Sequence, residues 1–567
     1  MSHRVNLNSI LPVEVLTTII VDRIVDDRSF TSPPSHVKHS YLADVALSIS
    51  HVCRLWRTIA LGPSGKRLWT HAPSRHTAAC VEAFMQRSHP LPVFLRIEAV
   101  FPRGQKPTSS SLPALQMALR HSARVNTMTV EFDIGNGGGD FDEEVFNYGV
   151  TEKYLKMVNL LDHHSFPALE YMSWTTWINI DQHTFSPNFF KMEIPASMKR
   201  LFLQNTEFNS SLAVLRAPLT SLVLHQCGSW SGIDDFITTL RNMPFLETLA
   251  ISSEGYSALD SSDIPSQHHH RSVQLCHLTR LALHDTLQVV PLLFTCMQAP
   301  KTCRVDLRLQ MYPIHFDVDR YWDHWGILES ALREHFESTA FTRLTVSGAG
   351  KDDDRFSLCA LSPTIPALNI GFNSHYQEFN RLNMRLLRTL CNLLSLPCLS
   401  QPCTILVRNI DLFSARLHDR NDNFTPPSFA TVREIIVTRS AVDNFVHALL
   451  RNLDRPLLPA LQSIGLRETL FCGTNLHVIE PILTSLIGAV VAREHLGAVQ
   501  SVKTIDFSQC RLTETAVDLL AEAVPNVEVF WDERCLSPNQ LADLRHRSEP
   551  EHEGIMGDII EEAQLPY

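Results

Sequence analysis

One short pattern recurs between residues 161 and 535: an apolar residue, two variable residues, an apolar residue, one variable residue and a third apolar residue. The clear copies are MKRLFLQNT at 198–206, LTSLVLHQC at 219–227, LETLAISSE at 246–254, LTRLALHDT at 278–286, LQSIGLRET at 461–469 and VKTIDFSQC at 502–510. The alternation that ends each copy is typical of a short β-strand. Clear neighbours start roughly 20 to 30 residues apart, which is typical of stacked structural repeats.

Segments with a helical pattern separate several of these strands. GIDDFITTLRNM precedes Pro244, and in TETAVDLLAEAV the apolar residues Val517, Leu520 and Val524 recur on one side. One strand and one helix cannot cover their own apolar faces, whereas a stack of such units forms a continuous core. We therefore expect an α/β fold over 161–535, a solenoid of short parallel strands and helices. With Leu at the inward positions and Cys or Asn soon after, it resembles irregular leucine-rich repeats. An irregular α/β domain of the same elements is the alternative.

The alternation divides each strand between two faces. Leu201 and Leu203 are expected to point into the core, and the residues between and after them to face the opposite surface of the sheet. That surface is predicted to bind a partner protein, called the client here, although a merely solvated sheet face accounts for any single position equally well. The candidate client-binding residues are Phe202, Gln204, His225 and His284.

The first 70 residues carry a different pattern, that of a small helical bundle. Pro12 opens the apolar stretch LPVEVLTTII, a polar loop with two prolines spans 26–40, and SHVCRLWRTIA at 50–60 is amphipathic at helical spacing. Three short helices enclose too little interior for this much apolar surface. Part of that surface is expected to contact another protein.

These residues resemble an F-box, in the form common in fungal proteins. The resemblance rests on Leu-Pro-x-Glu-Val-Leu at 11–16, Val-Cys-Arg-x-Trp-Arg at 52–57, Ile59-Ala60, and Leu68-Trp69. It implies docking onto the Skp-family adaptor of a cullin-RING ubiquitin ligase. The adaptor-binding residues that it implies are Leu11, Pro12, Val15, Leu16, Ile19, Val52 and Cys53, with Trp56 and Trp69 in the bundle core. The segment between Leu11 and Cys53 exceeds a minimal F-box by roughly twenty residues, which a polar loop accommodates at little entropic cost. The alternative is a helical cap without a partner.

The remaining segments complete the predicted organisation. Residues 71–160 are expected to connect the bundle of 1–70 to the repeats, with a helix and then a strand in AACVEAFMQRSHPLPVFLRIEA. Residues 536–567 are expected to form an acidic C-terminal tail.

Composition limits the classes of partner. The formal net charge is −11 and no long basic run occurs, which disfavours a nucleic-acid partner. Thirteen cysteines without a CxxC pair indicate free thiols in a reducing compartment. The apolar run at 482–492 is too short to span a bilayer. We expect no membrane association and a cytoplasmic or nuclear location, or both.

No catalytic, cofactor or metal motif stands out. GPSGK at 62–66 lacks the spacing of a phosphate loop and has Arg67 where Ser or Thr is needed. His268-His269-His270 and Asp352-Asp353-Asp354 are expected to be polar loops rather than metal sites. We therefore expect no enzyme, no cofactor and no metal. The predicted function is that of a non-catalytic substrate receptor of a Skp-cullin-F-box ligase, which holds a client protein on its repeats. The alternative is a leucine-rich-repeat interaction scaffold that acts outside a ubiquitin ligase.

Overall fold

The computed structural model describes two compact units. It describes residues 12, 15, 16 and 18 and then 41–532 with gaps, the longest at 134–151, 178–194, 254–271, 375–389, 409–428 and 468–480. Among the described residues, the first unit holds those up to Arg280 together with Cys296–Pro300, and the second holds Leu281–Thr295 and those from Lys301 onward. The predicted tail at 536–567 lies outside the described residues.

The first unit begins with a helical bundle. It contains α2 (Tyr41–Val52), α3 (Arg54–Leu61) and the 3-10 helix η3 (Pro63–Trp69). At Cys53 the backbone is extended, with φ −157° and ψ 173°, so the helical stripe expected to run from Val52 to Ile59 is interrupted there. The buried cluster of the bundle, called the bundle core here, consists of Leu16, Ala43, Ala46, Ile59, Ala60, Leu68, Trp69 and Phe84.

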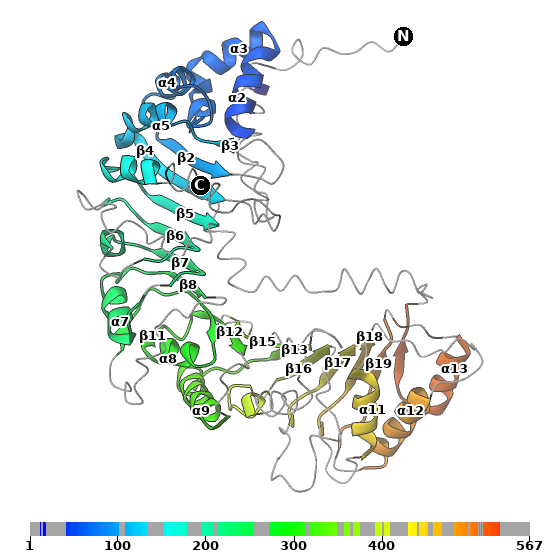
Figure 1. The fold of residues 1–567 in the computed structure, drawn as a ribbon. Coiled ribbons are helices and arrows are strands. Elements are labelled where there is room, and N and C mark those ends of the chain that lie inside the picture. Colours follow the sequence, from blue (N-terminus) through cyan, green and yellow to red (C-terminus); the bar gives the residue numbers. More distant parts are fainter. Residues whose placement is uncertain are drawn as a thin grey trace, which may run out of the picture. The chain divides into compact units, whose positions relative to one another are not determined.

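The sheet of the first unit starts immediately after the bundle. β1 (His71–Ala72) follows η3 and pairs in parallel with β2 (Val93–Val100), which pairs with β4 (Val125–Asp133). The sheet then continues, in parallel, through β5 (Tyr171–Trp177), β6 (Arg200–Gln204), β7 (Ser221–His225) and β8 (Thr248–Ser252). Figure 1 shows β2 and β4–β8 stacked in this order. The sheet therefore begins within the residues predicted to be a connector, well before residue 161.

Short elements fill the connections of the first unit. They are α4 (Ala78–Arg87), β3 (Thr108–Ser109, antiparallel to β2), α5 (Leu112–Leu119), η4 (Ser122–Arg124), η5 (Ala213–Arg216), α7 (Ile233–Arg241), β9 (Val273–Gln274) and β11 (Met297–Gln298). Register places Leu201, Leu222 and Leu249 side by side on adjacent strands, all with 1% exposure or less. This leucine row is the continuous core that stacked repeats require.

The turns after β6 and β7 explain the Asn and the Cys that follow these copies of the repeat pattern. Asn205 and Gln226 occupy equivalent places after β6 and β7 and both have positive φ, 51° and 53°. The Asn205 N–H donates to the His225 carbonyl oxygen at 2.9 Å. The buried Cys227 thiol then donates to the Leu203 carbonyl oxygen of the preceding repeat at 3.3 Å. These bonds satisfy backbone groups that the turn would otherwise leave buried and unpaired.

The second unit is a mostly parallel sheet with one antiparallel insertion. Its strands are β10 (Arg280–Thr286), β12 (Arg304–Met311), β13 (Arg343–Gly348), β14 (Phe356–Leu361), β15 (Leu368–Ser374), β16 (Thr404–Arg408), β17 (Glu434–Thr438), β18 (Ser463–Arg467), β19 (Thr504–Asp506) and β20 (Glu528–Phe530). From β12 the pairing order is β12, β15, β14, β13, β16, β17, β18, β19, β20, and β14 is antiparallel to both of its neighbours. This insertion departs from a simple solenoid.

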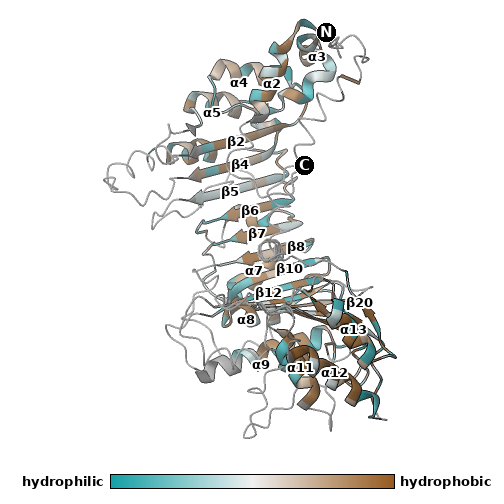
Figure 2. Ribbon diagram, turned by 90° about the vertical axis from the view of Figure 1, so that its right-hand side faces the viewer, coloured by the Kyte–Doolittle hydropathy of each residue, from teal (hydrophilic) through white to brown (hydrophobic). Residues whose placement is uncertain are grey.

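Helices cover the buried side chains of this second sheet. They are α8 (Val289–Thr295), α9 (Val318–His335), α11 (Ala441–Arg451), α12 (Pro481–Glu494) and α13 (Glu514–Ala523). The long apolar run of the sequence forms most of α12, and both α11 and α12 are largely hydrophobic in Figure 2. Leu483, Leu486 and Val490 of α12 are buried with 1% exposure or less, so the run supplies core.

Together the two units confirm the mixed α/β class and its mostly parallel strands. All six clear copies of the sequence pattern form strands, namely β6, β7, β8, β10, β18 and β19.

Candidate functional site

The candidate adaptor-binding residues lie at different depths in the bundle. Pro12, Val15 and Val52 are exposed, with 41% exposure at Val15 and 57% at Val52, and Cys53 is half-buried. Val52 ends α2 and Cys53 is the extended residue before α3. Leu61, at the end of α3, is a further exposed apolar residue. Leu11 and Ile19 lie outside the described residues.

Leu16 does not share this exposure. Its N–H donates to the Pro12 carbonyl oxygen at 3.0 Å, which shows that a helical turn follows Pro12. Successive residues on a helix are rotated by about 100°, so Val15 and Leu16 point in different directions. Leu16 is only 4% exposed and belongs to the bundle core. Its side chain stabilises the bundle and offers no open surface to a partner.

The two tryptophans assigned to the bundle core differ in burial. Trp56 is half-buried and packs against the bundle core from its edge. Trp69 is 1% exposed, and its Nε1–H donates to the Ala60 carbonyl oxygen at 2.7 Å. Its ring meets Phe84 of α4 edge to face at 4.8 Å, and the Arg87 guanidinium lies 4.4 Å from its centre. Trp69 therefore joins the bundle to the first helix of the sheet-bearing region.

GPSGK at 62–66 also has a structural role in this bundle. It caps α3 and forms most of η3. A Cβ atom at Gly65 would lie 2.4 Å from the Ala60 carbonyl oxygen, too close for any side chain. Glycine is needed here because η3 packs directly on the end of α3.

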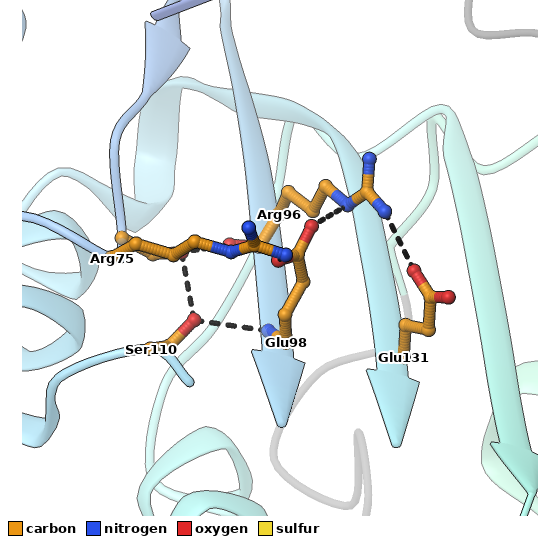
Figure 3. Close-up of polar contacts among 6 residues, drawn as sticks. Arg75, Arg96, Glu98, Ser110 and Glu131 are labelled. Atoms are coloured by element: carbon orange, nitrogen blue, oxygen red, sulfur yellow. Dashed lines mark hydrogen bonds and ion pairs between the residues drawn. The ribbon is translucent and has the colours of Figure 1, made fainter. Parts of the chain in front are cut away.

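A buried ionic network lies where the bundle meets the sheet (Figure 3). Glu98 of β2 forms ion pairs with Arg75, from the loop after β1, and with Arg96. Arg96 in turn donates to the Glu131 carboxylate of β4 at 2.7 Å. Ser110 Oγ accepts a hydrogen bond from the Glu98 N–H at 2.9 Å. Burial, with Arg96 nearby, lowers the pKa of Arg75 from its ordinary value. Because charges are costly to bury alone, these groups must be held in fixed mutual geometry.

The network continues into the bundle through the same loop. His76, next to Arg75, lies 2.9 Å from Asp44 of α2, measured from Nε2 to Oδ1. Ser74 of this loop lies 2.7 Å from Ser110, oxygen to oxygen. Sequence analysis missed these residues because it assigned them to a connector. The available signal was the presence of Arg96, Glu98 and Glu131 inside otherwise apolar strand segments.

The candidate client-binding residues are less open than expected. Register confirms that Phe202 and Gln204 lie on the face opposite the leucine row, but they are only 0% and 7% exposed. Phe202, Val223 and Ala250 are neighbours on β6, β7 and β8, and all three are buried. This face therefore carries a second buried apolar row. A strand buried on both faces reads as a continuous apolar run, and LFL, LVL and LAI are such runs.

The two candidate client-binding histidines differ in burial. His225 follows the apolar row of the first unit and is half-buried, so it retains some open surface. His284, in the second unit, is 4% exposed, and its Nε2 lies 3.5 Å from Oδ2 of the fully buried Asp306. The His284 side chain thus packs inside the unit rather than on an open client-binding face.

Searches of the described residues for two other kinds of site found nothing. No group of three or more His, Cys, Asp or Glu side chains in the described part of the chain is arranged to hold a metal ion. His268-His269-His270 and Asp352-Asp353-Asp354 fall outside that part. None of the described helices combines the length and the hydrophobicity that crossing a membrane requires.

The matches to known proteins are structural ones. No family model matches the chain, and no curated protein matches it. Among solved structures, the chain is similar to a leucine-rich-repeat protein of Leptospira interrogans, with 10% sequence identity and a TM-score of 0.27. The match covers 79% of this chain and 92% of the other.

Proposed function

We propose that this chain is the non-catalytic substrate receptor of a Skp-cullin-F-box ubiquitin ligase. Its N-terminal bundle docks the Skp-family adaptor, and its repeats hold a client protein for ubiquitin transfer by other subunits. The observation that carries the proposal is the exposure of Pro12, Val15 and Val52 on a bundle whose sequence resembles an F-box. Pro12 and Val15 are three residues apart beside the helical hydrogen bond from Leu16 to Pro12 and so share a face, and an exposed apolar face is typical of protein–protein contacts.

The connection between bundle and sheet supports the mechanism. Trp69 packs on Phe84, η3 runs directly into β1, and the loop that carries Arg75 and His76 bonds to both sides. No flexible linker separates the bundle from β2 in the described residues 41–100. A receptor acts by proximity, and a fixed connection raises the effective concentration of a bound client near the charged ubiquitin enzyme.

The proposal is tested by purifying the full chain from cells and measuring the adaptor and the cullin that accompany it. Pro12→Ala combined with Val15→Asp changes two exposed residues, so the bundle should stay folded while adaptor and cullin are both lost. Phe245→Asp is the matched control, because Phe245 is also exposed (56%) but lies just before β8. Retention of the adaptor by the double variant would reject the assigned docking residues.

A scaffold that acts outside a ligase is the second candidate. The burial of Leu16, one of the implied adaptor-binding residues, favours it. The same purification separates the two functions. A scaffold would co-purify with the adaptor but without a cullin, or with neither protein, whereas a receptor would co-purify with both.

A further inference from the structure

The second unit carries a polar row across the strands of its sheet. Ser347 of β13 pairs with Ser357 of β14 on one side and with Arg408 of β16 on the other. Beyond Ser357, Gly371 of β15 comes next, and then Arg308 of β12. We call Arg308, Ser357, Ser347 and Arg408 the arginine–serine row. The row has one guanidinium group at each end and two hydroxyl groups between them.

The row lies on the face of the sheet opposite the core. Side chains alternate between the two faces along a strand, so the neighbours of the row along each strand point the other way. These neighbours are fully buried: Leu307, Val346, Leu358, Ile370 and Val407. Adjacent strands are about 4.8 Å apart, so the Cα atoms of the two arginines are about 19 Å apart. That span suits a few residues of an extended peptide.

Two neighbouring donors of the row lack acceptors. Ser347 is 6% exposed, and its hydroxyl has no hydrogen-bond partner among the residues that the structure describes. A buried polar group without a partner costs about 1–3 kcal/mol. Arg408, directly beside it, is half-buried and forms no ion pair with another described residue. An acceptor that carries negative charge would satisfy both groups.

Arg308 lies at the other end of the row, with its side chain against Gly371. A Cβ atom at Gly371 would lie 3.3 Å from Cγ of Arg308, so the arginine side chain crosses the bare glycine of β15. Its Nε stays 4.0 Å from Oδ2 of the buried Asp306, which orients the guanidinium. A larger residue at 371 would obstruct this path.

We propose that the arginine–serine row binds an acidic peptide segment through its side-chain carboxylates. The planar guanidinium matches a carboxylate with two parallel hydrogen bonds, and serine hydroxyls add further donors. The whole chain has a net charge of −11, so binding of an acidic peptide must come from local groups rather than from general attraction. The role of the segment as part of a client rests on the proposed function, whereas the binding itself does not require the adaptor.

The test uses the full chain and a short fluorescent oligoglutamate peptide, with oligoglutamine as the uncharged probe, and measures fluorescence anisotropy. The wild type should bind oligoglutamate, and not oligoglutamine, with an affinity that falls as salt rises. Arg408→Gln should weaken binding about tenfold. Arg433→Gln is the matched control, because it removes the same charge from an exposed residue just before β17 and should leave the affinity unchanged.

Further variants and a competitor make the result decisive. Ser347→Ala should weaken oligoglutamate binding severalfold without lowering the thermal midpoint, because it removes a buried hydroxyl that has no partner among the described residues. Should Arg408→Gln fail to fold, Arg408→Lys keeps the charge without the planar fork and should still bind more weakly than wild type. Equal affinities for Arg408→Gln and Arg433→Gln would overturn the inference, and so would displacement of the peptide by millimolar inorganic phosphate, which would indicate a free-phosphate site. If the wild type binds the adaptor but does not bind oligoglutamate, this inference is contradicted and the proposed function is not.

Discussion

The described cysteines of this chain include both buried thiols that form hydrogen bonds and exposed thiols. Cys227 is buried behind the turn after β7 and donates to the Leu203 carbonyl oxygen, and Cys510 does the same for the Leu466 carbonyl oxygen at 3.0 Å in the second unit. Both thiols therefore stabilise a repeat by satisfying the backbone of the preceding one. Cys276 and Cys403, in contrast, are exposed.

This contrast predicts a pattern of chemical labelling. Burial raises the pKa of the Cys227 thiol to about 12, so the thiol is almost entirely protonated near neutral pH. Only the thiolate reacts with iodoacetamide. Between pH values of about 7 and 9 we expect alkylation of Cys276 and Cys403 in the native protein, and of Cys227 only after denaturation. Mass spectrometry of the labelled peptides measures this. Native labelling of Cys227 would contradict its assigned burial.

Trp69 predicts a stability difference between two substitutions. Trp69→Ala removes a fully buried ring and should lower the free energy of unfolding by about 3–5 kcal/mol. Trp69→Phe keeps most of the ring but leaves the Ala60 carbonyl oxygen without its donor, which should cost about 1–3 kcal/mol. Urea denaturation followed by circular dichroism compares the two variants. Equal losses would contradict the prediction, because they would assign the whole effect to the hydrogen bond that both variants lack and none of it to packing.

At the scale of elements, the junction between bundle and sheet rests on charge as well as packing. The loop after β1 bonds through Arg75 to β2 and through His76 to α2, so one short segment contacts both parts. Glu98 is the centre of this junction, because it pairs with two arginines while its own side chain is only 2% exposed.

Glu98→Gln should therefore destabilise the first unit strongly. It leaves the half-buried Arg75 and the buried Arg96 without a full counter-charge, and breaking a buried ion pair costs about 3–5 kcal/mol. Glu170→Gln is the control, because Glu170 is half exposed and its pair with Lys199 is 3.9 Å long. An exposed pair of this kind contributes about 0–1 kcal/mol. Thermal unfolding of both variants checks the prediction, and similar midpoints would contradict the role given to the network.

Sequence patterns predicted the strands better than they predicted the surfaces. The spacing of Leu201 and Leu203 located β6 and its inward face, because alternation follows directly from strand geometry. It did not predict that Phe202 would also be buried, since that depends on its neighbours Val223 and Ala250 in distant parts of the chain. The F-box resemblance likewise grouped Val15 with Leu16, although one is exposed and the other is in the bundle core. Burial is a property of packed elements, which a linear motif does not describe.

At the scale of the whole molecule, the structure consists of two compact sheet-bearing units, and the small bundle is the start of the first unit. The bundle shares its core with α4 of the first unit, and the arginine–serine row belongs to the second. The two proposed binding functions thus rest on different residues and can be disabled separately. A receptor requires both, because it must hold an adaptor and a client at once.

The central claim is that exposed apolar residues of the bundle dock the Skp-family adaptor, and calorimetric titration of the purified adaptor into the purified full chain tests it most directly. Val52→Arg and Phe245→Arg alter side chains of nearly equal exposure, 57% and 56%, so neither should disturb folding. The account predicts that Val52→Arg weakens adaptor binding at least tenfold, about 1.4 kcal/mol, while Phe245→Arg leaves it unchanged. Equal adaptor affinity for wild type and Val52→Arg would contradict it.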